Sequence, residues 1–94
     1  MKEIKNGCQL IAEERAKQIE KHGYTPEHDS AYNNNELILA AIAYLEGLIY
    51  GDHIAESLWP FEKQYLHLED GRIGTLKKAG AFIAAELDRI ELTK

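Results

Sequence analysis

The chain has 94 residues, of which 45% are hydrophobic and 29% charged, and its net charge at pH 7 is −5. This length fits one domain over residues 1–94, and the long aliphatic runs exclude a disordered chain. The eleven basic residues are scattered along the sequence, which argues against nucleic acid as a partner, because binding of a phosphate backbone needs clustered Lys and Arg.

The sequence also predicts where the protein works. A single cysteine, Cys8, cannot form an internal disulfide, which indicates a reducing compartment. Residues 1–6 lack the apolar run of a signal peptide, and the longest apolar stretch, residues 37–45, is too short to span a bilayer. We therefore expect a cytoplasmic protein without membrane contact.

A first helix is predicted from about residue 8 to residue 21. Its apolar residues recur three or four positions apart, and Cys8 lies among them, so we expect this cysteine in the core. Gly23 is typical of the left-handed residue that follows a helix. The apolar stripe consists of Ile4, Cys8, Ile11, Ala12, Arg15 and Ile19.

A polar segment, residues 23–35, separates this helix from the next. Thr25-Pro26 is typical of an N-cap followed by the first position of a short helix. The three asparagines at 33–35 are candidate caps for a second long helix, and Glu36 would lie at its positive end.

The second long helix is predicted over about residues 35–50, and it is apolar on nearly every side. Such a helix is either central in its own chain or half of a subunit interface. Gly51-Asp52 closes it, one or two helical turns are expected at 54–58, and Trp59-Pro60 interrupts the helix there. The tripeptide Glu69-Asp70-Gly71 indicates a turn.

The last helix has the most regular pattern in the chain. Its residues alternate three and four apart in the manner of a coiled-coil seam, which predicts a core face or a contact with a second copy. The whole sequence therefore predicts an all-α fold, a small bundle of three principal helices plus short helical turns, for which a homodimer is an option. The seam consists of Ile73, Leu76, Gly80, Ile83, Leu87 and Ile90.

His28-Asp29 is the first candidate for chemistry. Adjacent His and Asp side chains can bind a metal ion, and His titrates near neutral pH. The alternative is a structural role in which Asp29 caps backbone amides and His28 donates to a carbonyl, and we favour this second interpretation.

Carboxylates at the margins of the helices form the second candidate. If the three long helices pack together, Glu14, Glu36 and Glu86 could converge with Asp29 on a Mg²⁺ ion, which prefers oxygen ligands and can activate water against a phosphate. The alternative is that the glutamates are solvated and paired with neighbouring cations. The full set of candidate ligand-binding residues is Glu14, Gln18, His28, Asp29, Glu36, Lys78 and Glu86.

Aromatic residues are a third group, in particular around Trp59-Pro60-Phe61. These rings could line a pocket for a planar ligand or close the end of the bundle, and closure is the default because aromatic side chains bury a large area.

Nine fragments of the chain carry a family resemblance. They are Glu14-Arg15, Gln18-Ile19, Gly23-Tyr24-Thr25-Pro26-Glu27-His28-Asp29, Glu36-Leu37, Ala40-Ala41, Trp59-Pro60, Leu76-Lys77-Lys78-Ala79-Gly80-Ala81, Ile83-Ala84 and Glu86-Leu87-Asp88-Arg89. Together they resemble a family of short phage and prophage proteins of unassigned activity. The resemblance implies a setting and not a mechanism, and in the loop this chain has Tyr24 where the family usually has Trp.

A weaker resemblance is to the all-α nucleoside-triphosphate pyrophosphohydrolases, which hold Mg²⁺ with pairs of carboxylates one helical turn apart. This chain has Gln18 one turn after Glu14 and Ala40 one turn after Glu36. Two functions therefore follow from the sequence. The first is a phage-type helical binding or interaction module, and the alternative is a Mg²⁺-dependent nucleotide pyrophosphohydrolase-like enzyme.

Overall fold

The structure, a computed structural model, describes residues 4–94 and is helical, with no strand in that range. It confirms the all-α fold with three long helices and short turns between them. Residues 1–3 of the predicted domain lie outside the described part of the chain. The elements are α1 (Gly7–His22), α2 (Pro26–Asp29), α3 (Glu36–Tyr50), α4 (Asp52–Leu58), the 3-10 helix η1 (Lys63–Tyr65) and α5 (Gly71–Thr93).

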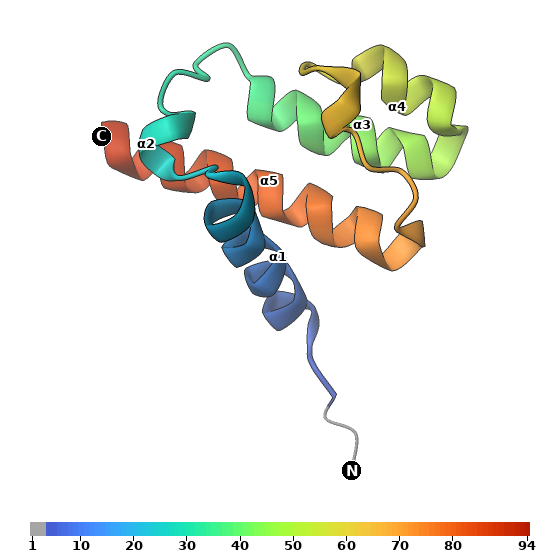
Figure 1. The fold of residues 1–94 in the computed structure, drawn as a ribbon, viewed down its shortest axis with the longest axis horizontal. Helices are drawn as coiled ribbons and strands as arrows, with labels where there is room; N and C mark the ends of the chain where they lie inside the picture. The colour runs from blue at the N-terminus through green and yellow to red at the C-terminus, as the bar shows by residue number, and fades with distance from the viewer. Residues whose placement is uncertain (1–3) are drawn as a thin grey trace.

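The helices form a flat arrangement with α3 and α5 at its centre (Figure 1). Helix α4 folds back on α3, whereas α1 and α2 pack against α5. The N-terminal half of α1 projects away from the other helices (Figure 1). The extents of the molecule are 41 × 34 × 19 Å, so its shortest dimension is less than half its longest.

Local sequence signals explain where the first helices begin and end. The Asn6 side chain accepts from Gln9 N at 2.9 Å and the Gln9 side chain accepts from Asn6 N at 2.7 Å, which forms a capping box. Gly23 ends α1 in the left-handed conformation at φ 71°, as predicted. Thr25 caps α2 by accepting from His28 N at 3.1 Å, and Pro26 takes the first helical position, also as predicted.

The start of α3 differs from the predicted asparagine cap. Asn35 occupies the N-cap position with φ 66°, and its side chain makes no capping hydrogen bond. Glu36 instead reaches back, and its Oε1 accepts from Asn34 N at 2.7 Å. This carboxylate satisfies a backbone donor at the positive end of the helix.

The core lies between α3 and α5 and is built from small residues and rings. Seven of the eleven buried hydrophobic residues among residues 4–94 are alanines, and Tyr44, Trp59 and Phe82 supply most of the remaining volume. Ring centroids of these three residues lie 5.4 to 6.2 Å apart. Trp59 thus closes the core, which is the role that the sequence favoured for it.

One prediction about burial was wrong, and of another the structure leaves only one of the two alternatives. On α1 the buried side chains are polar, namely Glu14, Arg15 and Gln18, and Cys8 is exposed. The reason is tertiary, because α1 places its polar side against α5, where Arg15 Nε donates to Asp88 Oδ2 at 3.0 Å. The heptad seam of α5 is also not in the core of the single chain, since Ile73, Leu76, Ile83, Leu87 and Ile90 are all exposed.

The described helices also bear on the membrane question. None of those in residues 4–94 combines the length and the apolar character that a bilayer-spanning segment needs.

Candidate functional site

A buried ion pair anchors the loop after α1. The Arg15 and Asp29 side chains are only 8% and 1% exposed, and their nearest charged atoms, Nη2 and Oδ2, lie 3.9 Å apart. Arg15 Nη1 also donates to the carbonyl oxygen of Tyr24 at 2.8 Å and to Gln18 Oε1 at 3.1 Å. The Arg15 guanidinium therefore connects α1 with the loop and with α2, and its Nε donates to Asp88 on α5.

His28 completes this arrangement from the solvent side. Its Nδ1 lies 2.9 Å from Asp29 Oδ1, and because a carboxylate can only accept, Nδ1 is the donor. Among residues 4–94, the Asp29 carboxylate accepts no hydrogen bond from a backbone amide and belongs to no set of metal ligands. Its contacts with Arg15 and His28 hold α2 in place. The contacts are of the structural kind that we favoured, although the partners are side chains and not backbone.

Three of the candidate ligand-binding residues line one small hollow. Glu14 and Gln18 on α1 face Lys78 on α5, together with Tyr24 and Tyr44. Glu14 Oε2 lies 4.0 Å from Lys78 Nζ, and Glu14 Oε1 lies 3.4 Å from Lys17 Nζ. The remaining residues of this hollow are His22, Tyr65, His67 and Phe82.

Lys78 also donates to the exposed Asp70 at the start of α5. This hydrogen bond lowers the pKa of the Asp70 carboxyl below its ordinary value. The hollow therefore contains charges of both signs, and Lys78 pairs with two carboxylates, those of Glu14 and Asp70.

The other candidate carboxylates are engaged elsewhere. Glu36 binds the backbone of Asn34, and Glu86 forms a bidentate pair with Arg89 at 2.7 and 2.9 Å, which lowers the pKa of the Glu86 carboxyl. Glu14, Asp29, Glu36 and Glu86 thus each have their own partner. Within residues 4–94, no group of three or more His, Cys, Asp or Glu side chains is placed to hold a metal ion.

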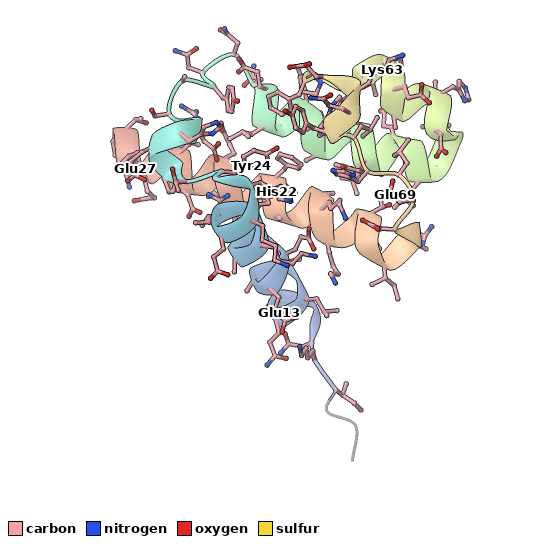
Figure 2. All side chains as sticks on the ribbon, viewed as in Figure 1. Glu13, His22, Tyr24, Glu27, Lys63 and Glu69 are labelled. Atoms are coloured by element: carbon pink, nitrogen blue, oxygen red, sulfur yellow. The ribbon has the colours of Figure 1, made fainter. Side chains whose placement is uncertain are left out.

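A large cavity adjoins the loop, and we call it the aromatic cleft. Its volume is about 780 Å³, and it lies between the end of α1 with α2 on one side and the segment after Trp59 on the other. Figure 2 labels two of its residues, His22 and Tyr24, where α1 passes into the loop. Its lining consists of Lys21, His22, Tyr24, His28, Tyr32, Pro60, Phe61, Glu62 and Tyr65.

The rings of the aromatic cleft form a continuous series. From His22 through Tyr24, His28 and Tyr32 to Phe61, successive ring centroids lie 5.6, 5.7, 5.6 and 5.2 Å apart. These separations are those of interacting aromatic pairs, so the rings support one another at the wall of the cleft.

Tyr24 lies at the centre of this region, since it lines the aromatic cleft, the hollow beside Glu14 and a third small hollow beside Asp29. Partial burial raises the pKa of its hydroxyl, and the nearby Tyr32, Tyr65 and Asp29 raise it further. The Tyr24 hydroxyl therefore stays protonated at neutral pH and is available as a donor.

Sequence reasoning missed this cleft as a unit. Of the predicted pocket segment Trp59-Pro60-Phe61, Pro60 and Phe61 line the cleft, whereas Trp59 fills the core. The available signal was that Tyr24, His28 and Tyr32 gather within one short polar segment, of which only His28 lies in a helix. The segment that brings Tyr65 opposite them carries no such signal.

Tyr44, next to this region, makes the free energy of unfolding depend on pH in the alkaline range. It is 1% exposed, its Oη accepts from His67 N at 3.0 Å, and burial raises its pKa to about 12 despite that hydrogen bond. In the unfolded chain it ionises near pH 10, so its contribution is complete below pH 10 and is lost as pH rises toward 12. Two pKa units correspond to about 2 to 3 kcal/mol of unfolding free energy.

Urea unfolding followed between pH 8 and 12 measures this loss. The variant Tyr44→Phe has no ionisable hydroxyl at this position, so most of the alkaline decline should disappear in it. An equally steep decline in Tyr44→Phe would show that another group is responsible.

Comparison with known proteins completes the description of the site. No family model matches the chain, and neither a curated protein nor a solved structure matches it.

Proposed function

We propose that this chain is a phage- or prophage-type helical binding module that holds a small planar ligand in the aromatic cleft. The observation behind the proposal is the continuous series of rings along a cavity of about 780 Å³. Ligand-binding cavities are usually of roughly 300 to 1,000 Å³ and combine apolar or aromatic walls with a few polar groups.

The polar residues at the cleft define how a ligand would be oriented in it. Lys21, His22 and His28 supply cationic or donor groups, and Glu62 is the one carboxylate in the lining. A planar ring would stack on Tyr24, Tyr32 or Tyr65, and an attached anionic group would lie toward Lys21. A planar anion such as a nucleoside monophosphate has both features.

This proposal is preferred to the Mg²⁺-dependent hydrolase because of how the carboxylates are used. Glu14 pairs with lysines, Asp29 with Arg15 and His28, and Glu86 with Arg89, while Glu36 binds backbone. A magnesium site would require several of these oxygens to face one point.

Titration of the protein with adenosine and guanosine monophosphates tests the proposal, with amide chemical shifts as the readout and inorganic phosphate as the non-aromatic control. We expect shifts at residues of the cleft and a roughly 5- to 150-fold weaker affinity in Tyr65→Ala, since a stacked base contributes about 1–3 kcal/mol. Tyr65 is 46% exposed, so its removal leaves the core intact.

Tyr50→Ala is the matched control, because Tyr50 is 63% exposed at the end of α3 and does not line the cleft. Failure of both nucleotides to bind at millimolar concentration would refute this ligand class, and an equal loss in Tyr50→Ala would refute the location. Release of pyrophosphate from a nucleoside triphosphate with Mg²⁺, abolished by Glu36→Ala, would favour the hydrolase.

A further inference from the structure

The aliphatic side chains of this protein lie mainly on its outside. Of the twenty-one isoleucines and leucines, all of them within residues 4–94, only Leu37 is buried, and eleven are exposed. Isoleucine and leucine are normally among the most buried residue types. The interior instead consists of alanines and aromatic rings, and eleven aliphatic side chains keep 36% or more of their surface in contact with solvent.

Helix α5 carries the most ordered part of this exposed surface, which we call the α5 stripe. Its members Ile73, Leu76, Ile83, Leu87 and Ile90 are 69%, 43%, 50%, 60% and 42% exposed. With Gly80 between Leu76 and Ile83, the positions alternate three and four apart. The stripe runs for about 25 Å along the helix. Such a pattern on one helix is that of a seam which packs into a second helix.

Helix α1 extends the same apolar surface. Ile11 packs into the gap that Gly80 leaves in the α5 stripe, since a Cβ atom at Gly80 would lie 2.6 Å from Ile11 Cδ1. Ile4, which precedes α1 and is 93% exposed, and Cys8 in the first turn of α1 continue this apolar surface toward the projecting end of the helix (Figure 1).

The α5 stripe is left uncovered by the single chain, and ordered exposed apolar surface of this kind usually marks an interaction site. We propose that a second copy of the chain covers it by packing its own α5 stripe antiparallel against the first. This proposal does not depend on the ligand of the aromatic cleft.

Heptad register favours a second copy over an unrelated partner. In an antiparallel pair centred between Gly80 and Ile83, Ile73 lies opposite Ile90 of the partner subunit and Leu76 lies opposite Leu87 of the partner subunit. At the centre, Ile83 of the partner subunit meets Gly80, whose missing side chain is already replaced by Ile11 of the same chain, so Ile11 joins this layer near the two-fold axis. Each layer thus pairs positions of complementary type, as a self-complementary interface requires.

Charge complementarity favours the antiparallel direction. The flank of the stripe is basic in its first half, at Arg72 and Lys77. It is acidic in its second half, at Glu91 and at Glu86, whose carboxylate also pairs with Arg89 of the same chain. In the antiparallel register Lys77 lies opposite Glu91 of the partner subunit and Arg72 lies opposite Glu86 of the partner subunit. A parallel pair would place like charges together, which disfavours that direction.

Molar mass in solution gives the first test. We expect the wild type to have twice the 10.7 kDa of the chain by light scattering, and Leu87→Glu to have 10.7 kDa with unchanged helical circular dichroism, because Leu87 is already 60% exposed in one copy. Ile49→Glu is the matched control, since Ile49 is 70% exposed on α3, and it should remain a dimer.

Each other result contradicts the proposal in a defined way. A wild type of 10.7 kDa at 100 µM would exclude the dimer, and a dimeric Leu87→Glu would exclude the α5 stripe. Conversion of Ile49→Glu to monomer would place the interface on α3 instead.

Disulfide trapping in a Cys8→Ser background tests the direction. Position 76 of one copy lies about 16 Å along the helix from position 76 of an antiparallel copy, too far for a disulfide. Leu76→Cys alone should therefore form no covalent dimer, whereas a mixture of Leu76→Cys and Leu87→Cys chains should form one upon oxidation. A covalent dimer of Leu76→Cys alone, with no covalent heterodimer between Leu76→Cys and Leu87→Cys chains in the mixture, would show the parallel arrangement.

Discussion

Replacement of Phe82 by alanine is expected to lower the free energy of unfolding by about 3 to 5 kcal/mol. Phe82 is 6% exposed, and its ring centroid lies 6.2 Å from Tyr44, 5.8 Å from Trp59 and 6.4 Å from Phe61. The surrounding alanines are too short to move into the vacated space, so a cavity would remain. Urea unfolding at fixed protein concentration measures the change.

A control on the same helix separates cavity formation from loss of helix stability. Leu92 is 47% exposed on α5, and Leu92→Ala should change the unfolding free energy by less than about 0.5 kcal/mol. A loss below about 1 kcal/mol in Phe82→Ala would mean that the aromatic cluster does not hold α3 and α5 together.

Arg15→Met is expected to have an effect of similar size for an electrostatic reason. It removes the cation next to Asp29, whose side chain is 1% exposed and which would keep only His28 as a polar partner. Removal of one member of a buried ion pair typically costs about 3 to 5 kcal/mol, because the other charge stays buried without compensation. Thermal and urea unfolding both report this loss.

Lys17→Met is the matched control on the same helix. The Lys17 side chain is 53% exposed and pairs with Glu14 at 3.4 Å, and loss of such a surface pair costs at most about 1 kcal/mol. A double variant with Asp29→Asn should recover part of the loss in Arg15→Met. If instead the two single losses simply add, the pair is not coupled as its geometry indicates.

The sequence predicted the helices well because their ends depend on local chemistry. Gly23, Thr25-Pro26 and Trp59-Pro60 each act within a few residues, and each lies where the pattern placed it. The prediction of which side of α1 is buried was wrong, because that side is determined by a contact between distant residues. Arg15 binds Asp88, 73 positions along the chain, and local periodicity does not indicate such a contact.

The candidate site was predicted in part. Glu14, Gln18 and Lys78 do share a hollow, since α1 and α5 pack together as expected of neighbouring long helices. The Glu36 and Glu86 carboxylates do not converge, because each one pairs with a group on or next to its own helix. The aromatic cleft needed the segment 60–65 to face the loop, which only the tertiary structure determines.

The alanine-rich core has a consequence for the heat capacity of the protein. A change in heat capacity on unfolding follows the apolar area that becomes hydrated, and globular domains average about 12–15 cal/mol/K per residue. Alanines bury little area each, and the exposed isoleucines and leucines of a single copy add little because water already surrounds them. The heat capacity of unfolding of one chain should therefore fall below the average. In an associated form, an increase of this heat capacity toward the average measures the aliphatic surface that association removes from water.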